Sequence, residues 1–173
     1  LTADDGNGNT ADASFDCIIT CASAEITVYI DVTLASTGRT GTPQYAIGGT
    51  VVFYQDPASW VPDDGNPVTG TALVTCGNLT AVHQSGNVTR FTCEGVTPDT
   101  TYDITVMGAD TLTNVANDVY VTGATFTKDM GSVAEGNFDG DEYINLNDYT
   151  ILVNNWLGPG PDGDITLDGT VNL

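Results

Sequence analysis

Oxygen-bearing side chains recur at a fixed spacing in one stretch near the C-terminus. Counting Asn137 as position 1, they occupy positions 1, 3, 5, 9 and 12, namely Asn137, Asp139, Asp141, Asn145 and Asp148. Tyr143 stands at position 7, where a backbone carbonyl would add a ligand. Calcium takes six to eight oxygens, and the loop of an EF-hand supplies them at this spacing. The sequence therefore predicts a Ca²⁺ site at 137–148, with Asp148 bidentate and Ile144 at position 8 turned inward.

A helix is predicted directly after this loop, because apolar residues recur there at helical spacing. The stripe consists of Leu146, Tyr149, Leu152, Val153, Trp156 and Leu157. Gly158-Pro159 should end the helix. The place of Trp156 in this stripe predicts a structural role for its ring.

A second copy of the loop pattern follows the helix. Positions 1, 3, 5, 7 and 9 are filled by Asp164, Thr166, Asp168, Thr170 and Asn172, and Val171 stands at position 8 like Ile144. The copy stops at position 10, so we expect the natural polypeptide to continue with position 12 and a second helix.

Loop, helix, Gly/Pro linker and second loop together resemble a dockerin type I module. The segment DGDEYINLNDYTILVNNWLGPGPDGDITLDGTVNL is also similar to repeats at the C-termini of planctomycete surface proteins. The resemblance covers residues 137–173 and implies calcium binding and docking onto cohesin domains. It departs from the family at position 6, where Glu142 replaces glycine, and it contains one of the two helices with which dockerins hold cohesin.

Acidic residues dominate the charge of the chain. There are 23 of them against three basic residues, for a net charge of −20. Nucleic acid and anionic membranes are excluded as partners, since no basic surface is available to meet phosphates. Bound cations or a saline environment would be needed to offset self-repulsion. No apolar run is long enough to predict a membrane span.

The four cysteines, Cys17, Cys21, Cys76 and Cys93, favour disulfides. A zinc site would use CxxC spacing and usually histidine, whereas this chain has CxxxC and a single histidine, His83. Two pairings stay open: Cys17–Cys21 with Cys76–Cys93, or a bond from Cys17 or Cys21 to Cys76 or Cys93. Disulfides indicate an extracellular location. Two Asn-X-Thr sequences agree with it and predict glycosylation at Asn78 and Asn87.

Short segments of alternating or β-branched residues predict an antiparallel β-sandwich of the immunoglobulin or fibronectin type III class. The strands are predicted at 15–20, 25–34, 45–54, 71–76, 79–84, 88–94, 101–108 and 119–127. Gly48-Gly49 predicts a bulge. GVTPDTTYDITVMGAD resembles a segment of fibronectin type III and bacterial Ig-like domains, and its Tyr102 is predicted to bond back across a sheet corner.

Four regions follow from these patterns. They are an extended arm at 1–14, the sandwich at 15–128, a linker at 129–136 and the calcium-binding module at 137–173. The segment 15–20 is either the first strand of the sandwich or a strand donated to a neighbouring subunit.

No enzyme is predicted, because His83 is the only histidine and lies in a predicted strand, and because no motif supports a carboxylate pair. Trp60 is either a platform for a glycan or a cover for the core. The predicted function is a secreted, calcium-binding structural protein that self-associates in a filament, matrix or surface layer. The alternative is an adaptor that docks to a cohesin scaffold or to polysaccharide.

Overall fold

The computed structural model describes residues 2–4, 10–12, 24–36, 38–56, 58 and 70–172. The predictions that concern 15–20, Cys17, Cys21 and Trp60 lie outside the described residues.

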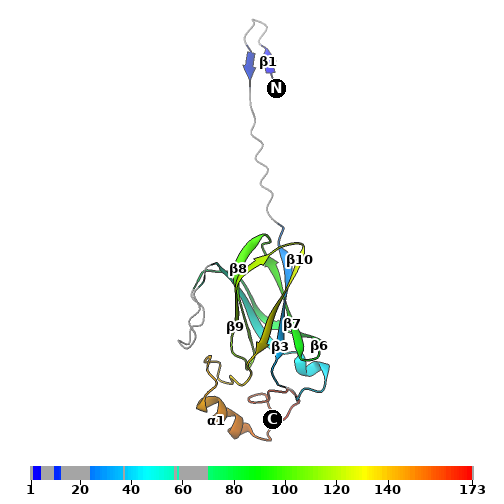
Figure 1. Ribbon diagram of the computed structural model, residues 1–173, viewed down its shortest axis with the longest axis vertical. Helices are drawn as coiled ribbons and strands as arrows, with labels where there is room; N and C mark the ends of the chain where they lie inside the picture. Colours follow the sequence, from blue (N-terminus) through cyan, green and yellow to red (C-terminus); the bar gives the residue numbers. More distant parts are fainter. Residues whose placement is uncertain are drawn as a thin grey trace.

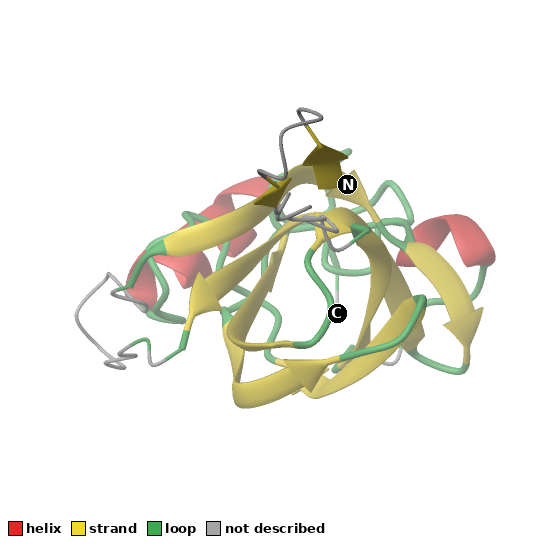
Figure 2. Cartoon of the chain, turned by 90° about the horizontal axis from the view of Figure 1, so that it is seen from above, coloured by secondary structure: helices red, strands yellow, loops and turns green. Residues whose placement is uncertain are grey.

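Two four-stranded sheets pack into a sandwich (Figures 1 and 2). One sheet has the order β10-β3-β7-β6, with β3 (Ile26–Leu34), β6 (Val82–Ser85), β7 (Val88–Val96) and β10 (Thr125–Val133). The other has the order β5-β4-β8-β9, with β4 (Gly48–Gln55), β5 (Ala72–Thr80), β8 (Thr100–Gly108) and β9 (Asn114–Val121). A 3-10 helix, η1 (Thr42–Tyr45), and an α-helix, α1 (Leu146–Asn155), complete the described fold, with a two-stranded sheet of β1 (Thr2–Asp4) and β2 (Thr10–Asp12).

The core lies between the two sheets. Side chains alternate between the two faces of a strand, and in β3 every second residue, from Ile26 to Leu34, is buried. Phe53 of β4 meets Tyr102 of β8 edge-to-face, with ring centroids 5.5 Å apart. The predicted mainly-β sandwich and its half-buried strand at 25–34 are confirmed.

The sheets are not wholly antiparallel, because β10 pairs with β3 in parallel. The predicted strand at 119–127 is wrong, since a turn at Gly123 (φ +84°) divides it between β9 in one sheet and β10 in the other. β10 then runs to Val133. The first part of the segment that the sequence predicted as a linker is therefore strand.

The boundary predicted near Gly77 is also wrong. β5 continues through Gly77 and Asn78, where the register shifts and Asn78 adopts φ +53°, so the Gly-Asn pair is a bulge and not a turn. The chain changes sheets at Ala81 instead, a buried residue whose N–H donates to the carbonyl of Ile47.

A disulfide joins the two sheets between Cys76 of β5 and Cys93 of β7. The Cα atoms are 5.7 Å apart, which is ordinary for a disulfide. The two strands become neighbours because the chain crosses from one sheet to the other at Ala81. This bond is one of the two pairings that the sequence left open for these cysteines.

Tyr102 closes the corner between β7 and β8. Its ring is buried, and its hydroxyl donates to the Thr97 carbonyl at 3.0 Å. The predicted bond across the sheet corner is confirmed.

We predict that Tyr102→Phe lowers the free energy of unfolding by about 1 kcal/mol, because it removes the hydrogen bond from the buried Tyr102 side chain to the Thr97 carbonyl. Tyr120→Phe is the matched control, since Tyr120 is 54% exposed and its hydroxyl bonds only to the exposed Asp99 at 3.3 Å. The control should change stability by less than about 0.5 kcal/mol. Urea unfolding measures both, and equal losses would contradict a special role for this corner.

Candidate metal centre and its junction with the sandwich

The first predicted loop brings three carboxylates together. Oxygens of Asp139, Asp141 and Asp148 all lie within 4.8 Å of one another. Asp148 reaches them from the first turn of α1, where Asn145 is the N-cap. Asn145 accepts from the Asn147 N–H at 2.7 Å, and Asp148 accepts from the Asn145 N–H at 2.8 Å. This capping box fixes the carboxylate of position 12 at the loop.

The remaining side chains of the loop are oriented by hydrogen bonds. Asn137 is buried, donates to the Thr111 carbonyl and accepts from the Asp141 N–H at 3.1 Å. Asp141 accepts from the N–H of Tyr143 at 2.9 Å and from the amide of Asn145 at 3.3 Å. Carboxylate and amide oxygens are the donors that Ca²⁺ prefers, and each oxygen has a second lone pair for a metal. The residues present therefore fit a calcium ion.

Electrostatics at this loop favour a cation. Desolvation, followed by the charges of Asp141 and Asp148, outweighs the backbone N–H of Asp141 and raises the pKa of the exposed Asp139 above its usual value. Burial alone would also raise the pKa of Asp148, but backbone N–H donors from Asn145, Phe138 and Asp139 together outweigh it and lower that pKa. No Lys or Arg follows Lys128 in the sequence to neutralise these charges.

Glu142 has a structural role that the sequence did not reveal. It stands at loop position 6 with φ +68°, a left-handed conformation that glycine adopts most easily. Its carboxylate accepts from the N–H of Thr113 at 2.9 Å and from the Thr113 hydroxyl at 2.6 Å. Glu142, which stands where the family has glycine, therefore bonds the first loop to Thr113, a residue that is distant in sequence.

The second loop is organised around one buried carboxylate. Asp164 accepts from the N–H of Gly169 at 2.8 Å, the N–H of Asp168 at 3.3 Å and the Thr166 hydroxyl at 3.3 Å. Thr170 donates its N–H to Asp168 at 2.9 Å, and Asn172 is half-buried. No group of three carboxylates forms here among the residues that the structure describes.

The two residues at loop position 8 differ in burial. Val171 is fully buried, and its backbone pairs with the end of the helical segment, accepting from the Leu157 N–H at 2.9 Å and donating to the Gly158 carbonyl at 3.0 Å. Ile144 is 50% exposed. The prediction that Ile144 turns inward is wrong, because the backbone of Val171 pairs with 157–158 and not with the first loop.

A buried ion pair anchors the second loop to the sandwich. Arg39 Nη2 and Glu135 Oε1 are 2.5 Å apart, and the two side chains are only 2% and 6% exposed. Arg39 also donates to the carbonyls of Gln44 and, in the second loop, Ile165. One guanidinium thus connects η1, the segment after β10 and the C-terminal loop.

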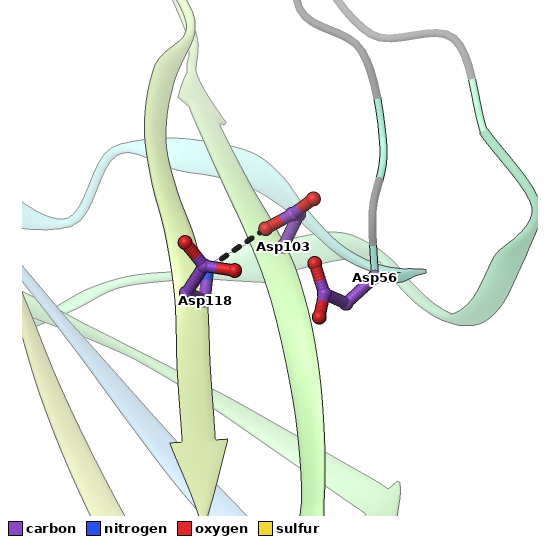
Figure 3. Close-up of side chains that lie close together, drawn as sticks. All are labelled: Asp56, Asp103 and Asp118. Atoms are coloured by element: carbon purple, nitrogen blue, oxygen red, sulfur yellow. Dashed lines mark hydrogen bonds between the residues drawn. The ribbon is translucent and has the colours of Figure 1, made fainter.

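A second group of three carboxylates lies on the sandwich and was not predicted. Asp56 follows β4, Asp103 belongs to β8 and Asp118 belongs to β9. Their carboxylate oxygens lie within 4.8 Å of one another (Figure 3). Asp103 is buried and accepts from the N–H of Asp118 at 2.8 Å and of Ala58 at 2.6 Å. Burial, then the charges of Asp118 and Asp103, raises the pKa of Asp56. Only strand pairing brings these residues together, so no sequence pattern indicates them.

Most of the apolar stripe along α1 and the two residues after it faces solvent, whereas Leu152 is half-buried. The helix has the predicted position, but its only buried residue is Asp148. The exposed fractions are 74% for Leu146, 60% for Tyr149, 48% for Val153, 45% for Trp156 and 71% for Leu157. The structural role predicted for Trp156 is therefore wrong. We call these five residues the α1 face, and Figure 1 places α1 at the end of the sandwich where the chain finishes.

His83 is a packed strand residue. Its ring stacks on that of Tyr45 with the ring centroids 4.1 Å apart, and its Nε2 lies 3.0 Å from the carbonyl oxygen of Gly86. Among the described residues, no helix combines the length and apolar character needed to cross a membrane.

No protein-family model and no curated protein matches the chain. Solved structures resemble it in fold. One is a chain of an N-terminal interface mutant of a type II cohesin-X-dockerin complex from Acetivibrio cellulolyticus, with 17% identity, a TM-score of 0.50 and coverage of 84% of this chain and 87% of that chain. A C-terminal interface mutant of the complex matches with 15% identity, a TM-score of 0.45 and coverage of 83% and 87%.

The first of these likenesses extends beyond the sandwich. The match covers 84% of the 173 residues, which is more than residues 1–133 alone could supply. It therefore includes part of the region after β10. At 17% identity it shows a shared fold alone.

Asp110 supplies a pH test of the junction. Burial, then the charges of Asp162, Glu135 and Asp164, raises its pKa from 3.8 to about 6. Because the folded-state pKa is the higher one, folding takes up a proton between these values. The Asp110 carboxyl therefore favours the folded state more at pH 4 than at pH 7.

We predict that Asp110→Asn raises the free energy of unfolding at pH 7 by roughly 1–3 kcal/mol in chelator, since each pKa unit corresponds to about 1.4 kcal/mol. The gain should disappear below pH 4. Urea unfolding at several pH values measures the difference, with the exposed Asp129→Asn as control. A gain independent of pH would contradict the assigned cause.

Proposed function

We propose that this chain is a secreted, non-catalytic docking protein, in which a calcium loop on a β-sandwich holds a short helix against a partner protein. The observation that carries the proposal is the α1 face. Five large apolar side chains, on α1 and on the two residues that follow it, are exposed in a chain of net charge −20. Exposed apolar patches mark interaction surfaces, and a helix face of this kind fits a groove on a partner.

The helix is held in place from both ends. At its start, Asn145 and Asp148 connect it to the first loop. After its end, Leu157 and Gly158 pair with Val171 of the second loop. Glu142 and Arg39 then bond the two loops to the sandwich. A pre-organised face loses less conformational entropy on binding, which is the advantage of mounting so short a helix on a sandwich.

Calcium is the ion we propose for the first loop. Its ligands would be Asn137, Asp139, Asp141, Asn145, Asp148 and the Tyr143 carbonyl. The second loop, with Asp164, Thr166, Asp168, Thr170 and Asn172, would be the weaker site because it offers fewer carboxylates. Bound Ca²⁺ would offset the repulsion among Asp139, Asp141 and Asp148 and so stabilise the first turn of α1.

We predict that calcium raises the melting temperature and the helix content, and that Asp141→Ala weakens calcium binding by about tenfold or more, since affinity follows the charge count of the ligands. Asp129→Ala, an exposed aspartate of β10, is the control and should bind calcium like the parent. Calorimetric titration and circular dichroism measure both effects. A melting temperature unchanged by chelator would refute the calcium site.

A cohesin domain is the partner class we propose. Two observations support it: the resemblance of 137–173 to dockerin modules, and the fold likeness to a chain of a cohesin-X-dockerin complex. The inter-sheet disulfide agrees with an extracellular location. Polysaccharide remains an alternative ligand of such an adaptor.

The α1 face is tested by binding to an immobilised type II cohesin in calcium. Tyr149→Ser and Leu157→Ser should each weaken binding about tenfold or more, as residues central to an interface do. Asn154→Ser alters an exposed polar residue of the same helix and should change affinity less than about twofold. Binding that tolerates all three substitutions would overturn the assignment of the α1 face.

Self-association in a filament, matrix or surface layer is the second candidate, because the α1 face could equally meet a second copy of the chain. Light scattering with calcium and with chelator separates the two functions. A structural subunit forms particles by itself in calcium, and Tyr149→Ser reduces them. An adaptor stays monomeric until its partner is added.

A further inference from the structure

The two Asn-X-Thr sequences of the chain differ sharply in accessibility. In the sequence at 87–89, the Asn87 side chain accepts from the Tyr45 hydroxyl at 3.1 Å and donates to the Ser36 carbonyl at 3.4 Å. Thr89 is fully buried in β7, and its hydroxyl donates to the Tyr45 carbonyl at 2.8 Å. Both groups that a glycosyltransferase must reach are therefore occupied in the folded protein.

The sequence at 78–80 is open. Asn78 and Thr80 are exposed, and they lie on β5, which among the described strands pairs with β4 alone and forms an edge of its sheet. Asn78 occupies the bulge with φ +53°. Next to it, a Cβ placed on Gly77 would meet no atom within 4 Å. An edge strand offers its backbone and side chains to other molecules without unfolding of the sheet.

A depression lies beside Asn78 on the sheet. Its volume is about 460 Å³, and it is lined by Gly48, Gly49, Thr50, Asn78, Leu79, Thr80, Met107, Gly108 and Ala109. Three of these residues are glycines, and a Cβ on Gly48 would approach the Leu79 carbonyl oxygen no closer than 3.9 Å. Met107 is 38% exposed there and supplies an apolar surface. Mixed apolar and hydroxyl lining suits a sugar, which has apolar ring faces and a polar edge.

We propose that Asn78 carries an N-linked glycan whose first sugars lie in this depression, and that Asn87 stays unmodified. In the transfer, Asn78 Nδ2 attacks C1 of the first sugar of a polyprenyl-pyrophosphate-linked oligosaccharide. The new N–C1 bond replaces the C1–O bond, the polyprenyl pyrophosphate leaves, and a base of the oligosaccharyltransferase takes the proton from Nδ2. No redox partner is required.

A glycan at this position has a physical consequence for the edge of the sheet. β5 would otherwise present unpaired backbone groups to the strands of other molecules. A bulky, hydrated chain at its bulge prevents such pairing. The modification thus leaves the α1 face as the surface for partners, and it does not depend on calcium or on the proposed docking.

The test begins with the folded, unglycosylated protein, which is incubated with an oligosaccharyltransferase and a lipid-linked oligosaccharide. Peptide mass spectrometry should find one glycan, at Asn78, and Asn78→Gln should lose it completely. Asn87→Gln is the matched control and should be modified like the parent. After reduction and unfolding in urea, followed by dilution into the reaction, Asn87 should also become an acceptor.

The outcomes discriminate clearly. Modification of Asn87 in the folded protein, or no modification of Asn78 when the unfolded chain is an acceptor, would overturn the proposal. Met107→Asp tests the depression separately: the glycan should still attach, while the rise in melting temperature that it causes in the parent should be lost. An unchanged rise would refute the contact between the glycan and the depression.

Discussion

Arg39, one of three Lys and Arg residues in the chain, forms a buried ion pair with Glu135. Glu135 is also one of the charges that, with burial and the charges of Asp162 and Asp164, raise the pKa of Asp110. The guanidinium also holds the Ile165 carbonyl of the second loop. Removing one partner of a buried pair costs far more than the pair contributes, because the other charge is left uncompensated. The attachment of the second loop to the sandwich therefore depends on Arg39.

The consequence of this attachment is an α-helix of ten residues that is held in one place while its apolar side stays exposed. Isolated helices of this length are marginal in water. Here the helix begins at a capping box that shares Asp148 with the candidate calcium loop, and its far end pairs with Val171. The loop 137–148, the helix and the sandwich are thus one connected unit.

Local patterns predicted a large part of this structure. The alternation in 25–34, the Tyr102 corner and the helix after 145 depend on period and spacing, which a sequence displays directly. The boundaries of the strands were harder to predict. Gly77-Asn78 has the composition of a turn but forms a bulge within β5, and the strand predicted at 119–127 is divided between sheets. Turn-forming residues permit a left-handed backbone, and partner strands decide whether the chain reverses there.

The sequence by itself determined the oxygen spacing of 137–148 and the presence of an amphipathic helix, because both are properties of contiguous residues. Only the tertiary structure decided that the α1 face is exposed, that Glu142 bonds to Thr113, and that Asp56, Asp103 and Asp118 meet. An apolar stripe in the sequence indicates a surface suited to burial, but it does not identify the molecule or segment that covers that surface. The partners of Glu142 and Asp103 come from segments distant in the chain, which only the fold brings together.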